Sequence, residues 1–126
     1  MKVFRIPLFV LLLLLTFTLC NSAAVSHRCQ DWTMQLQTID HKATAQRWDE
    51  ASKDLDTLYE SWSECQTWLH TVIEHKEIDA AEALLQRCIV LCEEEDNVEF
   101  RATLADLRSQ FGLLDEMERI SIKNIL

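Results

Sequence analysis

Apolar residues recur at alternating steps of three and four along most of the chain. This spacing puts them on one face of an α-helix, and that face can be buried against neighbouring helices. The sequence therefore predicts four amphipathic helices. Their apolar positions are Cys29, Trp32, Leu36, Ile39 and Ala43 in the first; Trp48, Ala51, Leu55, Leu58, Trp62, Cys65, Leu69 and Val72 in the second; Ala81, Leu84, Leu85, Cys88, Ile89, Leu91 and Cys92 in the third; and Phe100, Leu104, Leu107, Phe111 and Leu114 in the fourth.

The breaks between these strings carry helix-start signals. Asp79 and Asp96 each stand three residues before a Glu, which resembles the capping box and places an acid at the positive end of the helix dipole. The break between the first two strings is less marked: either Asp40 or Thr44 could cap a new helix, or one helix could run through with a shift of its apolar face. We expect the helices near residues 28–42, 45–74, 80–94 and 97–118.

Short connections between these helices make neighbours antiparallel. One Gly and one Pro in 126 residues disfavour the turns that a β or α/β fold needs. The expected fold is all-α: an N-terminal transmembrane or signal helix followed by an antiparallel bundle of three to four amphipathic helices. The apolar segment at residues 120–126 is expected to fold back onto the bundle.

The first 25 residues differ in composition from the rest. Lys2 and Arg5 precede an apolar run over residues 6–20, and the next charge is Arg28. A basic start, an apolar middle and a small polar exit form an export signal. Extended to Val25 the run has 20 residues, which is about 30 Å as a helix and just long enough to span a bilayer.

We favour a retained anchor over residues 1–25, although the small residues after Cys20 also suit cleavage of a signal peptide. Lipid attachment at Cys20 is disfavoured because Leu19, the residue before it, is large. Basic residues near a membrane helix stay on the cytoplasmic side. The sequence therefore predicts a single-pass cell-membrane protein with a cytoplasmic N-terminus, contact with the lipid bilayer through residues 6–25, and an exported acidic domain over residues 26–126.

The exported part is strongly acidic. Removing the basic Lys2 and Arg5 from the whole-chain net charge of −9 leaves −11 for residues 27–126. A domain of this charge repels phosphate backbones, which disfavours binding to nucleic acid. The acidity suits a basic protein partner or a cation, or it serves solubility alone.

Four cysteines lie in the exported part. An even number in an exported domain is typical of disulfides. Yet Cys29, Cys65, Cys88 and Cys92 all occupy apolar positions of the four strings, and a free Cys is commonly buried as a small hydrophobe. Cys88 and Cys92 are four apart on one helix, where side-chain directions do not favour a bridge. We favour core packing, and one inter-helix disulfide or a metal site remain alternatives.

A polar cluster follows the second string at His70, Glu74, His75 and Glu77. His70 and Glu74 are four apart, so both could face one cation. Zinc needs three or four converging ligands, and only these two share a helix face. We favour a solvated helix end and assign no metal-ligating residue.

Trp68 is the candidate for a contact with a partner. It lies one position away from the apolar string, beside Leu69. A partly exposed Trp with a polar surround can anchor a peptide or another helix. Core packing at the edge of the string is the favoured interpretation.

Catalytic chemistry finds no support in the sequence. We assign no catalytic and no cofactor-binding residue. The only Gly, Gly112, falls inside the fourth expected helix, so there is no glycine-rich loop for a phosphate.

Some residues carry a resemblance to a known family. They are the string from Trp48 to Trp62, the pairs Trp68-Leu69 and Glu74-His75, and the segments Glu77-Ile78-Asp79 and Asn124-Ile125-Leu126. The chain resembles an uncharacterised family, classed as a domain of unknown function, of small N-terminally membrane-anchored helical proteins from Gram-positive, spore-forming bacteria. The resemblance implies an N-terminal anchor and an exported helical domain, and it brings no activity.

These features favour a membrane-tethered extracytoplasmic interaction or scaffold module that is not an enzyme and uses no cofactor. A long apolar helix face can present itself to a protein partner. The alternative is an exported protein that binds a small ligand or a metal through the His70/Glu74 cluster or the core cysteines.

Overall fold

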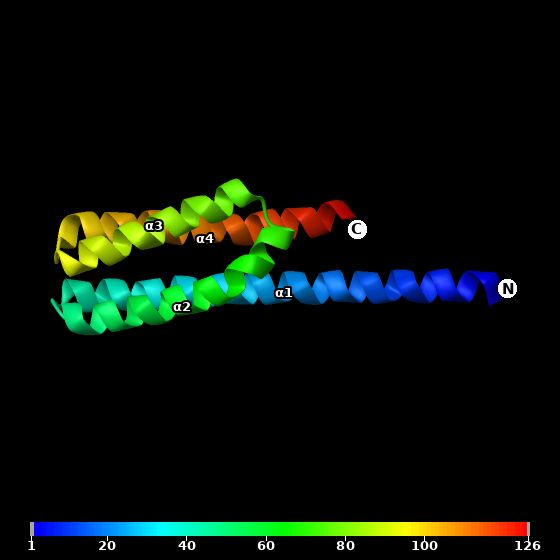
Figure 1. The fold of residues 1–126 in the computed structure, drawn as a ribbon, viewed down its shortest axis with the longest axis horizontal. Coiled ribbons are helices and arrows are strands. Elements are labelled where there is room, and N and C mark those ends of the chain that lie inside the picture. The colour runs from blue at the N-terminus through cyan, green and yellow to red at the C-terminus, as the bar shows by residue number, and fades with distance from the viewer. Residues whose placement is uncertain (1, 126) are drawn as a thin grey trace.

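The computed structural model describes residues 2–125, and for residues 2, 21, 22, 71, 72, 121, 122, 124 and 125 it describes the backbone only. This part of the chain forms four helices and no strand: α1 (Lys2–Thr44), α2 (Trp48–Val72), α3 (His75–Glu93) and α4 (Asn97–Ile125). The helix α1 packs against α2 and α4, and α3 packs against the same two helices (Figure 1). The prediction of an all-helical fold is confirmed.

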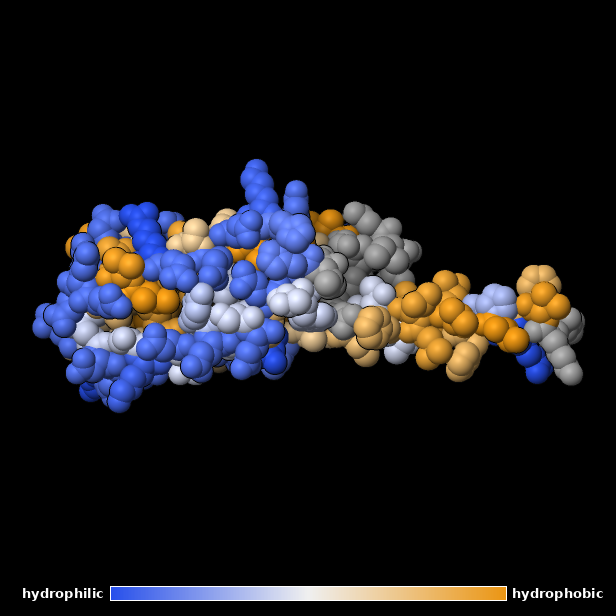
Figure 2. Space-filling view, viewed as in Figure 1, coloured by the Kyte–Doolittle hydropathy of each residue, from blue (hydrophilic) through white to orange (hydrophobic). Residues whose placement is uncertain are grey.

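The first helix has two parts with different surroundings. Its first part carries exposed apolar side chains such as Phe4, Leu11 and Phe17, whereas its second part is buried on one face from Val25 onward. In Figure 2 the first part projects as an apolar rod from a largely polar body. We expected a separate helix from about residue 28, but α1 is continuous because no Gly or Pro interrupts it after Pro7.

Two tight turns join α1 to α2 and α3 to α4. Each contains a residue with positive φ, Gln46 at 61° and Glu95 at 54°. In each turn a backbone N–H reaches back five residues, from Arg47 to the Lys42 carbonyl at 2.8 Å and from Asp96 to the Leu91 carbonyl at 3.2 Å. These bonds close the helix ends in the Schellman manner, and both turns lie at the end of the molecule opposite the N-terminus (Figure 1).

The start of α4 follows the expected cap, but the start of α3 does not. Asp96 accepts a hydrogen bond from the Glu99 backbone N–H, at 3.2 Å through Oδ1. We expected α3 to begin near residue 80 with Asp79 as its cap, and this prediction is wrong: α3 begins at His75. Ile78 is fully buried one turn before Ala81, so an extra helical turn adds an apolar residue to the core.

The buried faces of the four helices form one core. All the predicted apolar positions that the structure describes are buried or half-buried in it, and the Val72 side chain lies outside the described residues. Its centre is an aromatic cluster in which the Trp32 ring lies 5.4 Å from Trp62 and 5.3 Å from Phe111, between centroids. Both indole N–H groups are satisfied, since Trp32 donates to Ser61 Oγ at 3.0 Å and Trp62 donates to Glu82 Oε2 at 2.6 Å.

The segment after the last predicted string does not fold back as expected. α4 continues as a helix through Ile125, and the Ile120 side chain is 57% exposed. Helix continuation satisfies the backbone hydrogen bonds locally, whereas a reversal would need a turn that the sequence does not encode here.

Candidate functional site

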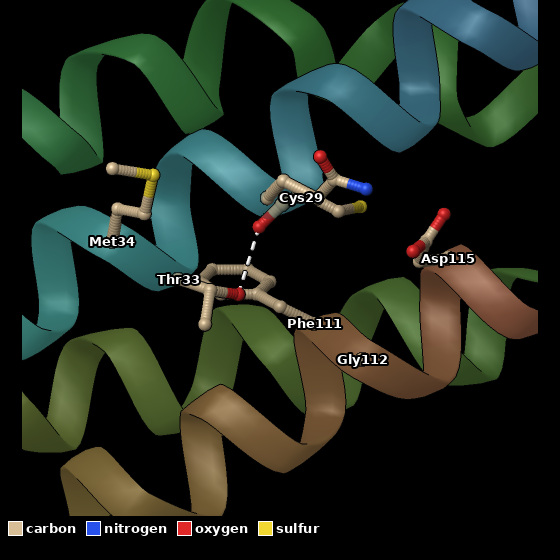
Figure 3. A pocket seen from close by; sticks show the side chains of 7 residues that line it. Cys29, Thr33, Met34, Phe111, Gly112 and Asp115 are labelled. Atoms are coloured by element: carbon tan, nitrogen blue, oxygen red, sulfur yellow. Dashed lines mark hydrogen bonds between the residues drawn. The ribbon is translucent and has the colours of Figure 1, made fainter.

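The surface between α1 and α4 is hollowed into a groove of about 330 Å³. Figure 3 shows its walls, with Cys29, Thr33 and Met34 on one helix and Phe111, Gly112 and Asp115 on the other. Gln30 completes the lining. The Phe111 ring and the Cys29 thiol are buried, whereas the Met34 side chain at the rim is 66% exposed. The groove therefore presents an apolar floor with polar groups at its edge.

Gly112 lies on the α4 wall of this groove. An added Cβ at this position would meet nothing within 4 Å, so no close packing inside the molecule requires a glycine. A glycine within a helix costs about 1 kcal/mol relative to alanine. The residue therefore weakens α4 slightly and adds no side chain to the groove wall.

Asp115 is the charged residue of the groove. Its Oδ2 pairs with the Arg119 guanidinium at 3.3 Å, and its Oδ1 is buried with no hydrogen-bond partner among the described residues. Burial, reinforced by the negative charge of Asp115, raises the pKa of the Cys29 thiol to about 12. The thiol is therefore protonated at neutral pH, and it does not act as a nucleophile.

The four cysteines that follow the apolar stretch, Cys29, Cys65, Cys88 and Cys92, are buried, as predicted. Burial raises the pKa of Cys88 to about 12 and also raises the pKa of Cys92. All are free thiols in the part of the chain that the structure describes. Such thiols pack as small apolar groups and react slowly.

The structure pairs His70 with His75 and not with Glu74. The two imidazole Nδ1 atoms lie 2.6 Å apart, with ring centroids at 4.5 Å. Because α2 ends at Val72, Glu74 stands outside it as the N-cap residue before α3, and its side chain is exposed. Among the described side chains, no group of three His, Cys, Asp or Glu residues could hold a metal ion.

Glu77, the last member of that cluster, lies elsewhere. Gln110 on α4 donates through Nε2 to the Glu77 carboxylate and to its backbone carbonyl, each at 2.9 Å. Glu77 therefore links α3 to α4 and does not join the two histidines.

Trp68 is half-buried and packs against the core at the edge of α2. Edge packing was the favoured interpretation, and the structure agrees with it. A contact between Trp68 and a partner stays a prediction.

One ionisable group of the core was not predicted. Glu118 on α4 is 6% exposed, and no hydrogen bond or ion pair to it is present among the described side chains. Burial raises the pKa of its carboxyl group. The signal was present in the sequence, because Glu118 follows Leu114 by four residues and Phe111 by seven and so continues the buried face of α4.

The fold and the groove define a small all-helical protein with an exposed apolar N-terminal helix. Residues 19–125 match the model of a family described as a domain of unknown function (DUF4363), so the chain belongs to this family. No curated protein and no solved structure matches the chain.

Proposed function

We propose that the protein is a membrane-tethered interaction or scaffold module, without catalytic activity, in which an antiparallel helical bundle stands outside the cytoplasmic membrane. The observation that carries this proposal is the two-part character of α1. Its apolar stretch is long enough to cross a membrane, and none of the side chains that the structure describes there is buried before Val25. The same helix then supplies one side of the core.

The exposed stretch supports the tether on energetic grounds. Burying a leucine or phenylalanine side chain away from water stabilises a protein by roughly 1.5–3 kcal/mol, and many such side chains on α1 are exposed, including Leu11, Phe17 and Leu19. A bilayer provides the apolar surroundings that the rest of the chain does not. Lys2 and Arg5 favour a cytoplasmic N-terminus through the positive-inside bias.

The tether and the bundle share one helix, and this restricts how the bundle is oriented relative to the membrane. No turn or loop separates the exposed part of α1 from its buried part, so the bundle has little freedom to tilt relative to its anchor. The groove between α1 and α4 then faces sideways, parallel to the membrane plane. A neighbour in the same membrane meets this surface more readily than a soluble partner does, because both are confined to two dimensions.

The proposed tether is tested by locating the C-terminus and the full-length protein relative to the membrane. A reporter that is active only after export, fused after Leu126, should be active, and the full-length protein should fractionate with membranes. An inactive reporter would overturn the orientation. A soluble product that begins near Val25 would show that the segment is a cleaved signal.

The interaction surface is tested by photo-crosslinking in the native cell. A photoreactive residue at the exposed Met34, on the groove rim, should capture a defined neighbour, whereas one at the exposed Val90 on α3 should not. Gly112→Phe should abolish the capture and Gly112→Ala should retain it, because only the larger side chain fills the groove. Equal capture at both positions would refute the groove as the contact surface.

A second function rests on the histidine pair. The Nδ1 atoms of His70 and His75 converge, and a transition-metal ion could bind there with water or a ligand from another molecule completing the coordination. The test is the metal content of the purified protein. A stoichiometric ion that His70→Ala removes would favour this proposal over a scaffold alone.

A further inference from the structure

The side of α1 that faces away from the bundle carries a stripe of residues with no Asp, Glu, Lys or Arg. We call it the outer stripe; its members stand at alternating steps of four and three, and all are exposed: Ala23, His27, Gln30, Met34, Gln37 and His41. The buried residues of the helix, such as Cys29 and Leu36, lie on the opposite side. Gln30 and Met34 also line the groove beside α4, so the outer stripe adjoins that groove.

Two open hollows on α1 repeat one arrangement of residues. The first, of about 380 Å³, is lined by this helix alone, through Asp31, Met34, Gln35, Gln37, Thr38 and His41. The second, of about 550 Å³, lies in the apolar part of α1. Each residue that lines it stands 21 positions before a residue of the first hollow, from Val10 before Asp31 to Cys20 before His41. The arrangement thus recurs after three heptads, and the heptad is the period of helices that pair in a left-handed coiled coil.

Each hollow has the form of a hole that a side chain of a facing helix fills in a coiled coil. Such a hole is bounded by four residues of one helix, and in the first hollow they are Met34, Gln37, Thr38 and His41. When two α1 helices run in parallel, Gln37 of each enters this hole of the other. The matching position in the anchor is Thr16, a small residue that allows membrane helices to approach closely. A straight α-helix drifts by about 60° over three heptads, and slight left-handed winding of the pair corrects this drift.

The distribution of charge favours a second copy of this chain as the occupant. Residues 27–126 carry a net charge of −11, and α2 alone has six acidic residues against one lysine, so two copies repel each other through such faces. Asp31, beside the outer stripe, faces Ser26 of the other copy in an in-register parallel pair, and Asp40 is held by Arg101 at 2.9 Å. Two outer stripes therefore meet without charge repulsion, whereas a basic partner is attracted to the acidic face of α2.

We propose that two copies of this chain form a parallel dimer through the outer stripe, along α1 from the anchor to the bundle. This inference rests on the proposed tether and names a second copy as the neighbour at the interaction surface. Anchors of the same orientation make the two α1 helices parallel, and α1 runs without a break from the anchor along the bundle (Figure 1). The pairing is isologous, so each stripe residue lies opposite the same residue of the other copy. Amide side chains at Gln30 and Gln37 hydrogen-bond across the axis and fix the register.

The inference is tested by oxidative cross-linking of the full-length chain in membranes. Gln30→Cys and Gln37→Cys are made in chains that also carry Cys20→Ser, and copper phenanthroline in air oxidises neighbouring thiols. The Cα atoms of one stripe position lie about 4–6 Å apart across a parallel pair, within the range that a disulfide spans. Each variant should give about fivefold more covalent dimer than Arg28→Cys, a change at an exposed position of the same helix outside the stripe. The product should contain both of two differently tagged copies.

The outcomes separate this inference from the proposals on which it rests. Equal dimer yields at positions 28, 30 and 37 would show random collision and overturn the pairing. Capture of a different protein at Met34, with no dimer at positions 30 and 37, would overturn the pairing and leave the interaction module intact. Fractionation of the chain away from membranes would overturn the tether and the parallel pair together.

A charge placed on the outer stripe provides a second test. Met34→Glu sets two carboxylates opposite each other, and it should lower the dimer yield at position 37 by about fivefold because like charges across an interface repel. Val90→Glu, on α3, should leave this yield unchanged. The two side chains are 66% and 51% exposed, so neither substitution disturbs the core. An equal response to the two substitutions would overturn the pairing.

Discussion

Replacing Trp62 by alanine tests the core that holds the four helices together. Trp62 is fully buried on α2, and its ring lies 5.4 Å from Trp32 and 5.7 Å from Phe111, between centroids. Its indole N–H also donates to Glu82 on α3. One side chain thus contacts all three other helices, and its removal weakens the packing of α2 against each of them.

The cost follows from these contacts. Truncating a buried aromatic residue to alanine typically lowers the free energy of unfolding by about 3–5 kcal/mol. The hydrogen bond contributes at the low end of the roughly 1.5–3 kcal/mol range for charged partners, because Glu82 is only half-buried and regains water when the bond is lost. Trp62→Phe keeps one ring and loses the N–H, so it should cost about 1–3 kcal/mol.

Urea unfolding of the full-length protein in detergent micelles, followed by far-ultraviolet circular dichroism, measures these differences. With a urea dependence of about 2 kcal/mol per molar, Trp62→Ala should lower the midpoint by about 2 M. Glu60→Ala, an exposed change on the same helix, should alter the free energy of unfolding by less than about 0.5 kcal/mol. Equal losses for Trp62→Ala and Glu60→Ala would show that the assigned buried face of α2 is wrong.

Two further predictions concern buried ionisable groups. Cys29, Cys65, Cys88 and Cys92 should react with a thiol reagent only after denaturation and titrate as free, and Cys88→Ala should cost on the order of 1 kcal/mol. Two missing thiols in protein produced with its N-terminal segment intact would refute this. Burial raises the pKa of Glu118, so folding favours its protonated form. Its contribution is fully present below the carboxyl pKa of the unfolded chain and is lost as pH rises through the folded pKa. Glu118→Gln should therefore remove this dependence and raise stability at pH 7, measured as the free energy of unfolding against pH.

Much of the fold was predictable because helix amphipathicity is a local property. The spacing of Leu58, Trp62 and Leu69 defines a single helix face whatever that face contacts, and the structure buries all three. The acidic cap at Asp96 acts on backbone groups within one turn, so it too was visible in the sequence. The apolar character of α1 before Val25 is likewise a matter of composition.

Contacts between helices determined features that the residue pattern of a single helix does not specify. α3 begins at His75 because an added turn buries Ile78, and Glu82 binds the Trp62 indole of α2 instead of capping its own helix. In the same way His70 meets His75 across the break between two helices. In each case the partner lies on another element, and no spacing along one helix reveals it.

The same distinction, between sequence pattern within one helix and contacts between helices, applies to the candidate surfaces. The sequence by itself determined which residues are apolar, where helices form and that the first helix is suited to a bilayer. Only the packing of α1 against α4 opened a groove at Gly112 and set Arg119 against Ser26, residues that are 93 positions apart in the chain. The physical reason is that burial periodicity is set within a few residues, whereas the register between two helices is set by side chains that meet only after the chain has folded.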